Sequence, residues 1–277
     1  LGLKHPQTAL GSYGADASGT TLPDSTMAYA PYDGGTASSV GLYTNSRPTT
    51  LMVKDIAAIQ YLYGKNEQYN LTDTVYTLSS FSNKDYIYAS IWDAGGNDTF
   101  SWSDQSSSAS IDLNDGSYSY FGKISSQSDT DLASTFSAGD GLLGIAHDAI
   151  IENAKGGSAS DTIKGNSSAN TLYGGSGTGI KDTLTGNGGA DIFVCSVSDA
   201  STDINVADII TDFSNGTDKI GLEDKTFSDL TITQISSGSF SGDVQIKDTS
   251  SNKILFLLDD TDVGLIDADD FIVTDFV

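Results

Sequence analysis

The sequence is poor in several residue types on which other classes of protein depend. Its 277 residues include one cysteine, Cys195, so no disulfide can form within the chain. Lys and Arg together number 13 against 37 Asp and Glu, which gives a formal net charge of −24. Phosphate recognition needs cations, so this balance makes nucleic acid a poor partner and disfavours an anionic membrane surface. No run of about 18 apolar residues occurs, so no transmembrane helix is predicted.

The excess of carboxylates has two explanations that composition alone leaves open. They can serve solubility or a saline environment as surface charge. Alternatively, they can bind a hard cation such as Ca²⁺, which prefers oxygen ligands. A chain without disulfides needs another source of stability, and bound metal is one such source.

One segment has a clear helical pattern. In LMVKDIAAIQYLYG, apolar residues recur at helical spacing, namely Met52, Ile56, Ile59 and Tyr63. Pro48 and Thr50 suit the start of this helix, and Gly64 suits its end. From about residue 66, short strand patterns alternate with Gly, Asn and Asp turns, and ILFLL near the end reads as a buried return strand. The sequence predicts a mainly β chain with a boundary near residue 65.

Between residues 156 and 194 the chain repeats itself with a period near nine: GGSASDTIK, GNSSANTLY, GGSGTGIKDTLT and GNGGADIFV. The glycine-rich half of each segment can turn tightly, because glycine tolerates positive φ. The other half offers one inward apolar residue: Ile163, Leu172, Leu184 or Ile192. This pattern predicts a parallel β-roll of the RTX type, with Ca²⁺ between stacked turns. A Gly/Ser-rich linker is the alternative, but it would not keep apolar residues in register.

The repeats are imperfect in ways that affect ion binding. Ala159 replaces a glycine, Asn170 replaces the aspartate, and a three-residue insertion precedes Asp182. We therefore expect fewer or weaker ions than a perfect array would bind.

Several motifs resemble one family from end to end. LGLKHP at the start is similar to the tail of the zinc motif H-E-x-x-H-x-x-G-x-x-H-P, and Ser25-Thr26-Met27-Ala28-Tyr29 is similar to a Met-turn. DIAAIQYLYG, IWDAGGNDTF, IDLNDGSYS, IAHDAIIENAKGGS and DIITDFSNGTDKI continue the match. The chain thus resembles the serralysins, which are secreted zinc endopeptidases of the metzincin group with a C-terminal calcium β-roll.

The resemblance implies two domains. Residues 1–65 would be the C-terminal part of a metzincin catalytic domain, which is incomplete here. Residues 66–277 would be the serralysin-type β-sandwich and calcium β-roll, with RTX repeats at about 156–194. The final DADDFIVTDFV resembles the uncleaved signal read by type I secretion machinery. The alternative is simply a last edge strand, and both can be true.

The resemblance also implies individual site residues. His5 would be the third zinc-binding imidazole, and Tyr29 would ligate zinc and stabilise the oxyanion above a floor formed by Met27. In the sandwich, calcium ligands would be Asp93, Gly95, Gly96 and Asp98, with carbonyls around Asn70, Thr72 and Thr74 and with Ile150 and Glu152. In the roll, they would be Gly157, Ala159, Asp161, Asn170, Gly174, Gly175, Gly177, Asp182 and Asp191, with Asp199 and Asp208 closing the last sites.

A metzincin needs three imidazoles on zinc and a glutamate that activates water. The first two histidines and the glutamate would precede Leu1, and His147 is expected to be a structural histidine in the sandwich. No signal peptide is recognised, although a chain that starts inside a motif could have lost one. We therefore expect the chain by itself to be inactive.

The predicted function is that of a fragment of a secreted serralysin-like zinc metalloendopeptidase, mostly its calcium-dependent folding and secretion module. Its partners would be several Ca²⁺ ions and the type I secretion machinery, with protein substrates only if the missing half completes it. Its location would be extracellular. The alternative is a non-catalytic RTX-type calcium-binding extracellular protein or adhesin; an RTX lipase is less favoured, because no G-x-S-x-G motif occurs.

Overall fold

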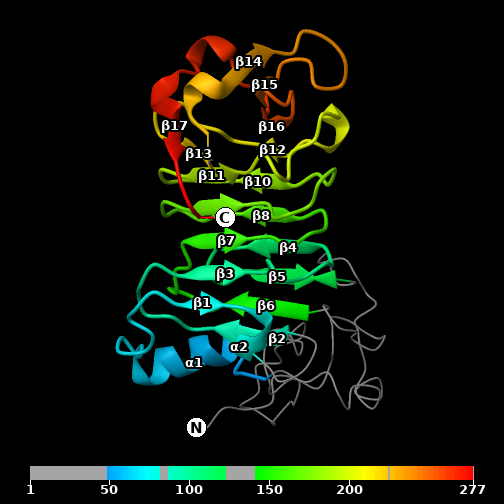
Figure 1. Cartoon of the computed structure of the whole chain (residues 1–277). Helices are drawn as coiled ribbons and strands as arrows, with labels where there is room; N and C mark the ends of the chain where they lie inside the picture. Colours follow the sequence, from blue (N-terminus) through cyan, green and yellow to red (C-terminus); the bar gives the residue numbers. More distant parts are fainter. Residues whose placement is uncertain (1–48, 82–86, 123–140, 224, 277) are drawn as a thin grey trace. The chain divides into compact units, whose positions relative to one another are not determined.

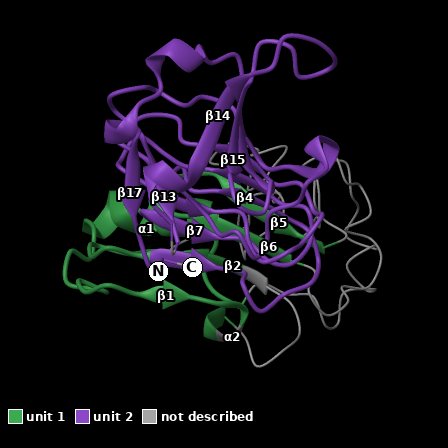
Figure 2. Cartoon of the chain, turned by 45° about the horizontal axis from the view of Figure 1, so that its top comes forward, with its two compact units in different colours: residues 1–98, 115–150 green, residues 99–114, 151–277 purple. Residues whose placement is uncertain are grey.

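The computed structural model describes residues 49–81, 87–122, 141–223 and 225–276. The chain divides into two compact units (Figure 2). Unit 1 comprises residues 1–98 and 115–150, and unit 2 comprises residues 99–114 and 151–277. Strands dominate the described residues, which confirms the mainly β prediction. The domain boundary predicted near residue 65 falls inside unit 1 and stays a prediction.

The predicted helix forms as α1 (Val53–Tyr63) in unit 1 (Figure 1). Asp55 fixes its start, because its carboxylate accepts a hydrogen bond from the Met52 backbone N–H at 3.1 Å. Gly64 ends the helix with a φ of +82°, a conformation that favours glycine. The expected apolar face is buried only at its start: Met52 is fully buried, whereas Tyr63 is 67% exposed.

A second short helix, α2 (Leu78–Phe81), was not predicted from the sequence. No helix among the described residues is long and apolar enough to span a bilayer. The described part of the chain also contains short 3-10 turns at Ile204–Val206, Phe227–Asp229, Val263–Leu265 and Ala268–Asp270.

Unit 1 is built around β6 (Gly141–Ile145), a strand whose residues are all buried. β6 pairs in parallel with β2 (Ile87–Ile91) and antiparallel with β5 (Tyr118–Phe121). A two-residue strand, β1 (Val75–Tyr76), also belongs to this unit. A Cβ at Gly144 would lie 2.6 Å from the Val53 side chain, so glycine lets the start of α1 approach β6 closely.

Unit 2 is a coil whose strands stack in two sheets. In the first sheet all neighbours are parallel: β3 (Thr99–Ser101), β7 (Asn153–Lys155), β9 (Thr171–Tyr173), β11 (Ile192–Cys195), β13 (Lys219–Leu222) and β17 (Phe271–Val273). The second sheet contains the parallel series β4 (Ala109–Asp112), β8 (Thr162–Lys164), β10 (Thr183–Thr185), β12 (Ile209–Ile210) and β16 (Ile254–Leu258).

Two antiparallel strands, β15 (Val244–Asp248) and β14 (Leu230–Gln234), extend the second sheet beyond β16. All five residues of β16 are buried, as the ILFLL pattern predicted. Through residues 162–195 the successive strands β8, β9, β10 and β11 alternate between the sheets (Figure 1). This alternation is the parallel β-roll expected from the nine-residue repeat.

The core of the roll confirms the predicted inward residues in three of its four segments. Ile163, Leu172 and Leu184 are fully buried. In the fourth segment the prediction was wrong: Ile192 is only half-buried, and Phe193 is the fully buried residue. The register explains this, because Phe193 pairs with Leu172 and both lie two positions after an Asp or Asn that precedes the strand.

Truncation of Leu172 tests this inward register. Leu172→Ala removes a fully buried side chain and should lower the free energy of unfolding by about 2–5 kcal/mol, measured by urea denaturation in saturating Ca²⁺. The exposed Lys164 on β8 provides the control, and Lys164→Ala should change the same quantity by less than about 0.5 kcal/mol. Equal effects of the two substitutions would contradict the register.

Candidate calcium sites

Strands of the roll are repeatedly preceded by a buried Asp or Asn. These side chains are each at most 3% exposed, although aspartate and asparagine are usually found at the surface. Each of them stands immediately before a strand, where a turn of the coil ends: Asp161, Asn170, Asp182, Asp191 and Asp218.

Three carboxylates form a first column along one edge of the roll. The Asp161 backbone N–H donates to Asp182 Oδ1 at 2.7 Å, and the Asp182 N–H donates to Asp208 Oδ1 at 2.8 Å. Asp199 was predicted to help close this end, and its charge raises the pKa of both Asp182 and Asp208. Its Oδ2 accepts a hydrogen bond from the Tyr173 hydroxyl. The structure thus brings four predicted ligands together.

Burial is the main cause of the raised pKa values in the first column. It raises the pKa of Asp161 to about 6, although backbone N–H groups of Gly157 and Ala109 each donate to its oxygens at 2.6 Å. Burial also raises the pKa of Asp182, and the nearby Asp208 carboxylate adds to this effect. Among the described residues, no lysine or arginine forms an ion pair with these carboxylates. The column therefore buries carboxylates that form no ion pair with a described lysine or arginine. Burial raises the pKa of Asp208, and the nearby charge of Lys181 lowers it.

A second column follows the other strand series and consists of Asn170, Asp191 and Asp218. The Asn170 N–H donates to Asp191 Oδ1 at 2.8 Å, and the Asp191 N–H donates to Asp218 Oδ1 at 3.0 Å. Burial raises the pKa of Asp191 to about 7, and the charges of Asp218 and Asp212 add to it. Asp212 accepts from the N–H groups of Gly186 and Asn187 at 2.8 and 2.7 Å.

Asp212 and Asp218 also belong to this cluster, and neither was predicted from the sequence. The position of Asp218 relative to its strand could have indicated it, because Asp218 stands directly before β13 just as Asp191 stands directly before β11. A third group, Asp243 with Asp259 and Asp260, was also missed and brings carboxylate oxygens within 4.8 Å of one another.

The glycines of the repeat lie where neighbouring turns make their closest contact. A Cβ at Gly156 would lie 1.9 Å from the Gly174 carbonyl oxygen. A Cβ at Gly175, whose φ is +123°, would lie 1.9 Å from the Gly157 carbonyl oxygen. Glycine is therefore required there, and backbone carbonyls come close to the carboxylates. The predicted ligand positions in these turns are Gly157, Ala159, Gly174, Gly175 and Gly177.

In unit 1 a second group of predicted ligands comes together from two loops. Asp98 is fully buried, and its Oδ1 accepts from the Thr74 N–H at 2.8 Å. Gly96 packs so closely on the other loop that a Cβ would lie 2.8 Å from the Thr72 carbonyl oxygen. The Thr74 hydroxyl donates to that same carbonyl at 2.9 Å. A carboxylate, a hydroxyl and a carbonyl thus lie side by side.

Asp93 forms the other half of this group and is 1% exposed. Its Oδ1 accepts from the Gly95 N–H at 3.0 Å, and its Oδ2 accepts from the Tyr76 hydroxyl at 2.5 Å. Asn70 donates in turn to that hydroxyl at 2.8 Å. Burial and the Asp93 hydrogen bond raise the pKa of Tyr76, which keeps the phenol protonated as a donor.

Two further predicted ligands are Ile150 and Glu152. Ile150 belongs to unit 1 and is 49% exposed. Glu152 belongs to unit 2, where its carbonyl accepts from the Thr171 N–H at 3.2 Å and from Asn170 Nδ2 at 2.9 Å. Their role as partners of Asp93 stays a prediction.

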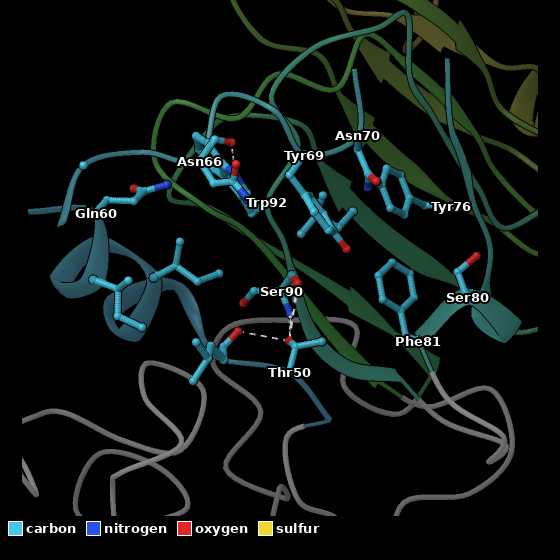
Figure 3. Close-up of a pocket in the computed structure, with 15 residues that line it drawn as sticks. Thr50, Gln60, Asn66, Tyr69, Asn70, Tyr76, Ser80, Phe81, Ser90 and Trp92 are labelled. Carbon is cyan, nitrogen blue, oxygen red and sulfur yellow. Dashed lines mark hydrogen bonds between the residues drawn. The ribbon is translucent and has the colours of Figure 1, made fainter. Parts of the chain in front are cut away.

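Unit 1 contains a pocket of about 420 Å³, whose lining includes Asn70, Tyr76 and Trp92 (Figure 3). Thr50 and Ser90 bridge its wall, because the Ser90 N–H donates to Thr50 Oγ1 at 2.7 Å. Asn70 and Tyr76 lie next to each other at its edge, and Asn70 Nδ2 donates to the Tyr76 hydroxyl at 2.8 Å. The lining is mainly apolar and aromatic: Thr50, Leu51, Ile56, Ile59, Gln60, Gly64, Asn66, Tyr69, Asn70, Tyr76, Ser80, Phe81, Ser90, Ile91 and Trp92.

The predicted zinc-site residues His5, Met27 and Tyr29 lie outside the described residues. The other histidine, His147, lies over a turn of unit 1, where a Cβ at Gly116 would come within 2.3 Å of its ring. Its Nδ1 is 3.6 Å from Asp115 Oδ2. The structural role expected for it stays a prediction.

Comparison with known proteins identifies relatives of one kind. Serralysin C of Dickeya chrysanthemi is 36% identical over 178 residues, which cover 59% of this chain and 33% of that protein. Serralysin B of the same organism is 41% identical over 121 residues, covering 40% of this chain and 22% of the relative. Metalloprotease AprA of Pseudomonas entomophila is 36% identical over 185 residues, covering 59% and 34%.

The chain therefore spans about a third or less of the length of these curated relatives. The profile described as "Peptidase M10 serralysin C terminal" matches residues 62–275. That match includes both buried carboxylate columns and the Asp93–Asp98 loop, and it confirms the resemblance drawn from the motifs. The chain belongs to the family of peptidase M10 serralysin C-terminal domains.

Proposed function

We propose that residues 66–277 are the calcium-dependent folding and secretion module of a secreted serralysin-like zinc metalloendopeptidase. One observation carries this proposal: the roll buries aspartates in columns without an ion pair to any described lysine or arginine. Burial of a carboxylate is costly unless it is paired or coordinates a metal. The relatives named as serralysins and as a metalloprotease support the protease context.

Calcium fits the donor set of the roll. It takes six to eight oxygen ligands, and carboxylates and backbone carbonyls are those it prefers. Asp161, Asp182, Asp199 and Asp208 would hold ions in the first column, with carbonyls of Gly157, Ala159, Gly174, Gly175 and Gly177. In the second column Asp191 would be the main ligand, and the nearby Asp212 and Asp218 add two carboxylates that the sequence did not suggest.

Unit 1 would hold a further ion. Its donors would be the carboxylates of Asp93 and Asp98 and oxygens of Gly95, Gly96, Asn70, Thr72 and Thr74, joined by Ile150 and Glu152. The buried carboxylates and the close Thr72 carbonyl support this assignment.

The module would act through linkage between calcium binding and folding. Where calcium is scarce, the acidic turns repel one another and the roll is unstable, which suits passage through the type I export channel. Outside the cell, each ion bound only by the folded state adds RT ln(1 + [L]/Kd) to stability. The calcium concentration would thus decide where the chain folds, and its final location would be extracellular.

In a complete relative, His5 would be a zinc ligand and Tyr29 would donate a hydrogen bond to the oxyanion of the tetrahedral intermediate. Zinc, when bound, would polarise the scissile carbonyl. A catalytic zinc site needs three protein ligands, so His5 and Tyr29 would need further ligands to complete one.

Metal content tests the proposal. The 277-residue chain, dialysed against Ca²⁺ and Zn²⁺ and analysed by plasma mass spectrometry, should carry several calcium ions and less than one zinc. Asp182→Asn replaces a buried carboxylate by an amide of equal size and should lose at least one calcium ion. The matched control is Asp203→Asn, at an exposed aspartate of unit 2, which should keep them all. An unchanged count in Asp182→Asn, or a chain without calcium, would refute the proposal.

A further inference from the structure

Asn170 holds a position that aspartate fills in neighbouring turns. Nine residues upstream, Asp161 closes its turn by accepting the Gly157 N–H at 2.6 Å, four residues back. Asn170 closes its own turn in the same way, because its Oδ1 accepts the Asn166 N–H at 2.7 Å. The two side chains are therefore equivalent in this respect.

Asp161 and Asn170 differ in the second terminal atom of the side chain. In Asp161 this atom is an oxygen, which accepts the Ala109 N–H at 2.6 Å. In Asn170 it is the amide nitrogen, which donates to the Glu152 carbonyl at 2.9 Å and to Asn166 Oδ1 at 3.2 Å. The backbone donor at Asn166 requires an oxygen opposite it, so the orientation of the Asn170 amide is fixed by its partners.

Asn166 adds a second buried amide to the same turn and is 7% exposed. Its Nδ2 donates to the Ile151 carbonyl at 2.9 Å and to the Leu113 carbonyl at 3.2 Å, while its Oδ1 accepts the Ser168 N–H at 2.8 Å. With Asn170, the two amides thus donate to three backbone carbonyls of unit 2. Carbonyl oxygens gathered in this way are the ligands that Ca²⁺ uses, and here amide hydrogens satisfy them.

We infer that the Asn166–Asn170 amide pair takes the place of a bound cation in this turn, so that the turn closes without calcium. The inference rests on the proposed function, because it contrasts this turn with neighbours that would take calcium. Asn170 was predicted as a calcium ligand, and its hydrogen bonds favour this other role. The consequence is a part of the roll that folds without calcium, formed by β8 (Thr162–Lys164), β9 (Thr171–Tyr173) and the turn that joins them.

An isosteric pair of substitutions tests the inference by ion counting. Asn170→Asp restores the carboxylate and should bind one more calcium ion per chain than the wild type. In chelator, its thermal midpoint should fall by about 4 °C or more, because a buried carboxylate oxygen then faces the Glu152 carbonyl. The matched control is Asp161→Asn, at the equivalent position of the preceding turn, which should lose one ion.

The two substitutions distinguish a failure of this inference from a failure of the proposed function. If Asp161→Asn loses an ion and Asn170→Asp gains none, the cation-replacement inference is wrong while the proposed function stands. If Asp161→Asn loses none either, the proposed calcium function of this turn fails.

Hydrogen exchange of the calcium-free wild type gives an answer even if a variant does not fold. The Thr171 N–H donates to the Glu152 carbonyl. Thr183 holds the equivalent place in the first column, and its N–H donates to the Asp161 carbonyl. In chelator, the Thr171 amide should exchange about tenfold more slowly than the Thr183 amide. Equal rates, or faster exchange at Thr171, would overturn the inference.

Discussion

Millimolar Ca²⁺ should raise the thermal midpoint of the chelated chain by roughly 15–30 °C, the largest effect that we expect from any single change of conditions. A site filled to 100 times its Kd stabilises the folded state by about 2.7 kcal/mol. Around three such sites would contribute about 8 kcal/mol, and each kcal/mol shifts the midpoint of a domain of roughly 200 residues by about 2–4 °C. The physical source is the relief of buried, like-charged carboxylates such as Asp182 and Asp208.

Circular dichroism at a strand wavelength measures this effect in a chelator and in calcium. Mg²⁺ at the same concentration is the control, because it demands octahedral geometry and gives up its water reluctantly. We expect it to produce less than about a third of the calcium shift. Superimposed melting curves in chelator and in calcium would show that the acidic columns do not bind the ion.

Acidification should stabilise the calcium-free chain, which is the second large effect. The pKa of Asp161 is raised from 3.8 to about 6 and that of Asp191 from 3.8 to about 7, both chiefly by burial. Because the folded state binds the proton more tightly than the unfolded state, this stabilisation is complete below about pH 4. It is lost as the pH rises through 6 and 7. In chelator, a change from pH 8 to pH 5 should therefore raise the midpoint by on the order of 10 °C.

In saturating calcium the sign should reverse. Protons then compete with the cation for the same carboxylates, so the change from pH 8 to pH 5 should lower the midpoint. Asp161→Asn provides the control in chelator, because an amide does not titrate and the pH dependence should become flatter. A calcium-free chain that loses stability between pH 8 and pH 5 would contradict the burial of uncompensated carboxylates.

The roll could be predicted from the sequence where its repeat is local and regular. Asp161 and Asp182 are 21 residues apart and contact each other, as Asn170 and Asp191 do at the same separation. Beyond Asp191 the separations grow to 26 and 27 residues, because longer loops enter the coil. The nine-residue pattern ends there although the coil continues, which is why Asp218 was missed.

The error at Ile192 has a similar cause. Both Ile192 and Phe193 are apolar, so hydrophobicity alone does not decide which one points inward. The backbone register decides, since Phe193 pairs with Leu172. In unit 1 the family motif indicated the Asp93 loop, but it did not indicate the Tyr76 hydroxyl that donates to Asp93. That contact joins residues 17 positions apart through side chains that no local pattern links.

The backbone N–H bonds that join each column would make the proposed calcium sites interdependent. In the first column, the carboxylate of Asp182 accepts from the backbone of Asp161, while the backbone of Asp182 donates to Asp208. An ion that orders one carboxylate would therefore also order the residue whose backbone N–H donates to the next carboxylate. Structures in which each coil contacts only its neighbours behave as one-dimensional chains of coupled units. Occupancy along a column should thus rise as a steep, cooperative function of calcium concentration rather than as a sum of independent sites.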